Sequence, residues 1–204
     1  MNRRFFLLSP LVVPLLAGGC SILPERPNVP VRRYPLAPRR PSASAGMASA
    51  PVLLVRRVRA VPGLQDLALR RVRTDGAFEY LPYEEWVASP ADLTDAALVA
   101  WLQASGLYAA VVQTGTRADA NIVLELQLTA LEAVPGSQQA RAALAGVLLR
   151  EDRLATRVIG TLEAAGTAPL AANATPPDTA RAMEAALGAA FAALEGQLAI
   201  QRRG

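Results

Sequence analysis

The run Ile122-Val123-Leu124-Glu125-Leu126-Gln127-Leu128-Thr129 is the clearest structural signal in this chain of 204 residues. Its leucines and isoleucine alternate with a second set of side chains that is mostly polar. Successive side chains of a strand point to opposite faces, so the alternation predicts a half-buried β-strand. A Pro-Gly-Ser turn at 135–137 follows, and two further runs, 140–150 and 154–163, come after it. We therefore expect an antiparallel meander.

Two helices are predicted from their start signals. Ser89-Pro90-Ala91-Asp92 and Thr175-Pro176-Pro177-Asp178 each place a hydroxyl three residues before a carboxylate, with proline in the first turn. Gly106 is expected to end the first helix. After each signal, apolar side chains recur every three or four residues and form one face, which predicts packing on a core. These residues are Leu93, Ala97, Leu98, Trp101 and Leu102 in the first helix, and Met183, Leu187, Ala190, Phe191, Leu194 and Leu198 in the second.

Short strands are expected before and between these elements. Residues 52–59 and 67–72 are rich in β-branched and aliphatic side chains, and Thr74-Asp75-Gly76 is a hairpin-turn signal that leads into 78–81. A further short strand is expected at 108–113. The predicted order is β-β-β-α-β-β-β-β-α, which indicates an α+β fold: a mostly antiparallel sheet packed against two helices.

The first twenty residues have the pattern of an export signal. Arg3 and Arg4 precede an apolar run of about 15 residues, shorter than the roughly 20 needed to span a bilayer. The run ends in Leu16-Ala17-Gly18-Gly19-Cys20, which looks like a lipobox, the site where a lipoprotein signal peptidase cuts. We expect cleavage before Cys20, the chain's one cysteine, and acylation of it. A plain signal peptide with an incidental cysteine is the alternative.

Three segments are therefore expected: a lipoprotein signal peptide at 1–19, the lipidated Cys20 with a tether to residue 50, and a domain at 51–204. The tether contains six prolines, and about 30 extended residues would reach roughly 90 Å from the bilayer. Tyr34 and Leu36 form an apolar pair within it. They are interpreted either as part of a solubilising linker or, in the favoured reading, as a short strand or hook that docks on the domain.

Composition argues against several functions. All 21 basic residues are arginine and histidine is absent, so neither a Ser-His-Asp triad nor a His-containing zinc site can be formed. Residues 1–50 carry a net charge of +6 from seven arginines and one glutamate, whereas residues 51–204 carry −2 from 14 arginines and 16 acids. A near-neutral domain does not favour nucleic-acid binding. We expect no enzymatic activity, no metal and no cofactor.

The remaining charged clusters are expected to be solvated. Glu84-Glu85 and Glu151-Asp152 are interpreted as surface acids at turns or strand ends rather than an acid–base pair. Two arginine clusters, at 56–59 and 70–73, would form one basic strip if the first two strands paired; a solvated sheet face is the simpler interpretation. Trp86 is expected to be a core anchor or part of a partner surface.

The chain resembles the ABC-type transport auxiliary lipoprotein family, the PqiC-like lipoproteins of MCE-type transport systems. The likeness rests on Tyr34-Pro35-Leu36 soon after the lipobox, Arg56-Arg57-Val58 leading to Pro62-Gly63-Leu64, and the stretch 80–86, where Trp86 stands just before the first helix. Ala97-Leu98 and Leu102 follow in the expected order.

The resemblance implies a non-enzymatic accessory lipoprotein, whose partners are an MCE-domain protein and ABC transporter components that move phospholipid or other hydrophobic compounds across the envelope. Ser21, in place of Asp after the cysteine, favours the inner leaflet of the outer membrane, facing the periplasm. Tyr34, Leu36 and Trp86 are the candidate partner or docking contacts. An outer-membrane assembly or structural lipoprotein is the alternative, and self-association stays open.

Overall fold

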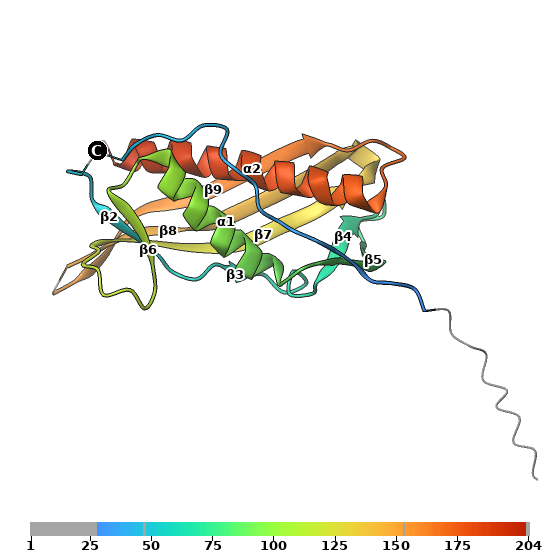
Figure 1. The fold of residues 1–204 in the computed structure, drawn as a ribbon, viewed down its shortest axis with the longest axis horizontal. Coiled ribbons are helices and arrows are strands. Elements are labelled where there is room, and N and C mark those ends of the chain that lie inside the picture. The colour runs from blue at the N-terminus through green and yellow to red at the C-terminus, as the bar shows by residue number, and fades with distance from the viewer. Residues whose placement is uncertain (1–27, 47, 153, 203–204) are drawn as a thin grey trace, which may run out of the picture.

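The computed structural model describes residues 28–46, 48–152 and 154–202, and Figure 1 shows a sheet with both helices on one of its faces. Cys20 and the predicted signal peptide lie outside the described residues. The elements, in chain order, are β1 (Arg32–Tyr34), β2 (Val52–Val55), β3 (Arg59–Ala60), β4 (Ala68–Val72), β5 (Phe78–Trp86), α1 (Pro90–Ser105), β6 (Ala110–Gln113), β7 (Ile122–Val134), a 3-10 turn (Pro135–Ser137), β8 (Gln139–Glu151), β9 (Thr156–Pro169) and α2 (Pro176–Gln201).

The predicted meander is confirmed as the framework of the sheet. β7 pairs antiparallel with β8 from Ile122 opposite Arg150 to Val134 opposite Gln139, and β8 pairs in the same way with β9. The strands are longer than the sequence indicates. For example, β9 continues to Pro169 rather than ending at residue 163. Thirteen residues of β7 span about 43 Å, which sets the long axis of the molecule.

The other edge of β7 holds a series of short segments. β2, β3 and β4 pair with it in turn, all parallel, so the chain runs along one long strand rather than folding back. The first two predicted strands therefore pair with β7 and not with each other. β4 forms the predicted antiparallel hairpin with β5. β1 pairs in parallel with the other edge of β5, and β6 pairs in parallel with β2.

Both predicted helix starts are confirmed. The hydroxyl of Ser89 accepts the backbone N–H of Asp92 at the start of α1, and Thr175 and Asp178 form a reciprocal capping box at the start of α2. Gly106 ends α1 at a φ of 68°, a left-handed conformation that favours glycine. Each cap satisfies backbone groups that the helix itself leaves unpaired.

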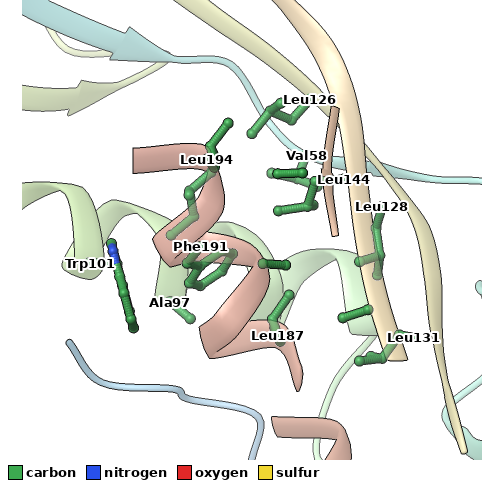
Figure 2. Packing of buried hydrophobic residues seen from close by; sticks show 14 of the residues in the cluster. Val58, Ala97, Trp101, Leu126, Leu128, Leu131, Leu144, Leu187, Phe191 and Leu194 are labelled. Atoms are coloured by element: carbon green, nitrogen blue, oxygen red, sulfur yellow. The ribbon is translucent and has the colours of Figure 1, made fainter. Parts of the chain in front are cut away.

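The core lies between the helices and the meander (Figure 2). Leu187, Phe191 and Leu194 of α2 point toward the leucines of β7 and β8, and the rings of Trp101 and Phe191 meet edge to face, 5.6 Å apart. Among the described residues, α2 is the helix whose length and composition could span a membrane. Its apolar face is packed on β9 and β8 and forms part of this core.

The α+β class and the element order are confirmed, with β1 and β3 as two short additional strands. The sheet is mixed: its long pairs and the β4–β5 hairpin are antiparallel, and the remaining short pairs are parallel.

Candidate functional site

The segment just before the domain is held against it along its length. We call residues 32–46 the strap. It begins at β1 beside β5, crosses in front of the two helices, and ends near the C-terminus of α1 (Figure 1). The strap leads toward Cys20, so its contacts decide how an anchor at that position would hold the domain.

The strap starts as a strand. Arg32, Arg33 and Tyr34 lie opposite Glu84, Glu85 and Trp86 in parallel register. The backbone N–H of Val87 donates to the carbonyl oxygen of Tyr34 over 2.9 Å. β1 therefore completes one edge of the sheet.

Glu84 joins the strap to β5 through its side chain. Its carboxylate accepts hydrogen bonds from the Arg32 guanidinium and, over 2.6 Å, from the Tyr34 hydroxyl. Burial and this hydrogen bond raise the pKa of the Tyr34 phenol above its usual value. Only 8% of the Glu84 side chain is exposed, so the expectation of a solvated Glu84 is wrong. The strand pairing brings a cation to it that lies 52 residues away.

Leu36 and Trp86 are both buried in the main core, each with 1% of its surface exposed. Contact with another protein needs exposed surface, which these two side chains lack. They act inside the fold, where Leu36 fastens the strap and Trp86 lies opposite Tyr34. Tyr34 is half-buried and packs against the same core.

Arg40 fastens the middle of the strap to both helices. Its guanidinium donates two hydrogen bonds to Glu195 of α2, each 3.0 Å long, and Trp101 of α1 donates its indole N–H to the same carboxylate over 2.8 Å. The hydrogen bonds to Glu195 raise the pKa of Arg40 above its ordinary value. A bidentate pair of this kind also fixes geometry.

Close backbone contacts hold the end of the strap. The Ser44 N–H donates to the carbonyl oxygen of Ala104 over 2.9 Å. A Cβ at Gly106 would lie 2.9 Å from the carbonyl oxygens of Ser44 and Ala45, closer than real side chains approach. Gly106 thus serves two purposes, as the helix end and as the surface on which the strap lies.

The tether is consequently shorter than residues 20–50. Residues 32–46 are part of the folded structure, and the interpretation of Tyr34 and Leu36 as a loose linker does not fit their placement. Arg32 lies twelve positions after Cys20, and a fully extended chain of twelve residue steps spans about 40 Å.

The two arginine clusters do not form a basic strip. Strands β2 and β4 lie at different points along β7, and each cluster forms its own ion pairs with nearby carboxylates of the fold. The ion pairs are Arg56 with Glu125 and Glu151, Arg57 with Asp92, Arg70 with Glu132, Arg71 with Glu79, and Arg73 with Asp75. Glu151 is thus half-buried and paired, whereas Asp152 is exposed as predicted.

An open hollow of about 730 Å³ lies beside the first of these clusters and is lined by Arg56, Arg57, Arg59, Glu125, Gln127 and Val147, among others. Within the described ranges, no three side chains of the metal-binding types come together.

The hydrogen bonds that Arg40 and Trp101 donate to Glu195 are not predicted from the sequence. One signal was present: Glu195 stands four residues after Phe191, beside the apolar stripe of α2, where a carboxylate needs a partner. The position of that partner, 155 residues earlier, has no sequence signal.

No protein-family profile and no curated protein matches the chain. Among solved structures, it is similar to protein XCC0632 of Xanthomonas campestris, described as a DUF330 family member, with a TM-score of 0.68, 20% identity, and coverage of 83% of this chain and 96% of that one. A second structure, of an uncharacterised protein, matches with a TM-score of 0.56 and 14% identity over 81% of this chain and 96% of the other. Over about four-fifths of its length, the chain has the fold of a DUF330 protein.

Proposed function

We propose that this chain is a lipid-anchored periplasmic accessory lipoprotein of an MCE- and ABC-type transport system, which moves phospholipid or other hydrophobic compounds across the envelope. Acyl chains on Cys20 would hold it in the inner leaflet of the outer membrane. It would act without catalysis, as a binding module that contacts an MCE-domain protein and the transporter components. The shared fold with a DUF330 protein supports an accessory role in general terms.

The observation that carries this proposal is the strap. An anchor on a loose linker would leave the domain free to tumble, but here β1, Leu36 and the Arg40–Glu195 pair attach the chain to the sheet and both helices. The chain that leads to Cys20 therefore leaves the domain at one defined place, the sheet edge at β1. Such an arrangement suits a protein that must present one surface to a partner at a fixed place near a membrane.

The test is a membrane pull-down of the tagged chain after brief cross-linking in its native host, combined with palmitate labelling. We expect labelled protein that recovers an MCE-domain protein and an ABC component. Cys20→Ala should lose both the label and the partners, because two or more acyl chains are what give stable anchoring. Ser21→Ala is the matched control and should retain both.

The outcomes separate the claims. Unchanged labelling of Cys20→Ala would reject the anchor. Normal labelling with no MCE or ABC component in the recovered material would reject the transport role and leave an outer-membrane assembly or structural lipoprotein.

A further inference from the structure

The exposed apolar side chains of this protein are unevenly distributed. Of the ten large hydrophobic residues that are exposed in the described part of the chain, seven lie on or beside β1, β4 and β5: Val29, Val31, Leu67, Phe78, Tyr80, Tyr83 and Val87. The other three, Leu154, Val158 and Ile200, lie at the opposite end of the long axis, at the β8–β9 hairpin and the end of α2. Single exposed hydrophobic residues are ordinary, but a group of seven marks a contact surface.

Phe78, Tyr80 and Tyr83 lie in β5, and the other four residues lie just before β1, just before β4 or just after β5. β1, β5 and β4 are adjacent in the sheet. Val31 and Tyr83 each stand one residue before the paired positions Arg32 and Glu84. We call this surface, built by the seven residues, the β1–β5–β4 edge.

The backbone of β5 is distorted where it meets this surface. Between the pairs Ala68–Glu85 and Arg70–Tyr80, β5 has four residues opposite the single Leu69 of β4, which is a large β-bulge. Tyr83 lies within the bulge at a φ of 62°, a left-handed conformation that is rare for an aromatic residue, and its surface is 52% exposed.

The position of the lipid anchor identifies what covers the edge. The described chain joins the fold at β1, in the middle of these residues, and Cys20 precedes Arg32 by twelve residues. Acyl chains at Cys20 would therefore keep a bilayer within about 40 Å of this edge. The bilayer would lie nearer to this edge than to the β8–β9 hairpin. Tyrosine suits the headgroup region of a bilayer, and phenylalanine occurs on the apolar faces that are buried at the boundary between headgroups and acyl chains.

We propose that the β1–β5–β4 edge rests on the lipid bilayer, with Phe78, Tyr80 and Tyr83 at headgroup level. The inference depends on the anchoring at Cys20 in the proposed function but not on its transport partners. It gives the domain a defined orientation, with the β8–β9 hairpin and the end of α2 pointing into the periplasm.

The small net charge of this edge favours a membrane contact made by apolar side chains over one made by attraction to anionic lipids. Residues 28–35 and 67–87 contain five arginines and four carboxylates, a net charge of +1, and Arg32, Arg33 and Arg73 are all ion-paired. Exposed paired charges at the rim are compatible with zwitterionic and anionic headgroups alike. The contact should therefore persist as the salt concentration rises.

Fluorescence quenching by brominated lipid tests the orientation. The full lipidated chain is reconstituted into vesicles of phosphatidylethanolamine with a minority of phosphatidylglycerol, with or without bromine on the acyl chains. Tyr83→Trp and Phe78→Trp report on the proposed surface, and Leu154→Trp, at a residue that is 99% exposed on the distal hairpin, is the matched control. The native Trp86 and Trp101 are buried and give the background.

We expect brominated lipid to reduce the added emission of Tyr83→Trp and Phe78→Trp and to leave that of Leu154→Trp unchanged, in low and high salt. Equal quenching at all three positions, or none at the first two while the protein floats with the vesicles, would overturn the proposal. A concentration-dependent blue shift without quenching would also overturn it, in favour of a second copy on this edge. A protein that does not float at all would instead reject the anchor.

Discussion

The two parts of this domain are stabilised in different ways. The meander of β7, β8 and β9 with α2 consists of long elements that follow one another in the chain and share an apolar core. The other part consists of the β4–β5 hairpin and the strap, which is attached to it by the short β1 pairing, by hydrogen bonds to Glu84 and by burial of Leu36. The first part resembles an independently stable framework, and the second depends on contacts between distant residues.

This difference matters for the proposed function. A surface that rests on a membrane or carries an anchor must be positioned by a framework that does not deform. The meander provides that framework, and the strap transmits its position to the chain that leads to Cys20. Elements with few buried apolar contacts are also the ones that open first.

Phe191→Ala should have the largest effect, because it removes the ring at the centre of the framework. Phe191 is fully buried and contacts Trp101 edge to face. We expect the free energy of unfolding to fall by about 4 kcal/mol, measured by chemical denaturation. Ile200→Ala, at an exposed position of the same helix, is the control and should change it by less than about 0.5 kcal/mol. A similar loss for both would mean that α2 does not form the core described here.

Leu36→Ala should have a smaller but still clear effect, about 2–3 kcal/mol, because a cavity would form under the strap. Hydrogen exchange should show faster exchange in β1 and the facing part of β5, with β8 unchanged. Val29→Ala, exposed just ahead of the strap, should leave both measurements unaffected. Uniformly faster exchange throughout the sheet would show that the two parts unfold as one, and the contrast between them would then be lost.

The smallest effect is expected at the first turn of α2 when the pH is lowered. Hydrogen bonds from Thr175 and Arg181 lower the pKa of Asp178 to about 2 from 3.8. A lowered pKa in the folded state means that the stabilisation is present above the unfolded value and is lost as the pH falls through about 2. Exchange at the start of α2 should rise over that interval. Asp178→Asn should remove the pH dependence of exchange at the start of α2; its persistence there would assign the effect to another group.

The framework could be predicted from the sequence because its signals are local. The alternation at 122–129, the capping residues Ser89 and Thr175, and Gly106 each depend on neighbours within a few residues. The structure confirms all of them. The boundaries were less accurate, since β5 runs to Trp86 and β9 to Pro169, well past their strongest apolar patterns.

The strap side could be predicted only in part. Tyr34 and Leu36 stood out as an apolar pair, but a three-residue strand has no periodicity to recognise. The pairing of Arg32 and Tyr34 with Glu84 depends on β1 lying beside β5, about 50 residues away. The ion pairs of the arginine clusters could not be predicted for the same reason. Arg56 and Arg70, for example, pair with Glu125 and Glu132 of β7, which lie far away in the sequence.

The meander, both helix starts and the single cysteine can be recognised in the amino-acid sequence, since each rests on covalent chemistry or on residues a few positions apart. Three features follow from the three-dimensional arrangement instead: residues 32–46 belong to the fold, Glu84 is buried and bonded to Arg32 and Tyr34, and seven exposed apolar side chains lie on or beside β1, β4 and β5. The physical reason is that long-range pairing depends on which surfaces remain after the framework has formed.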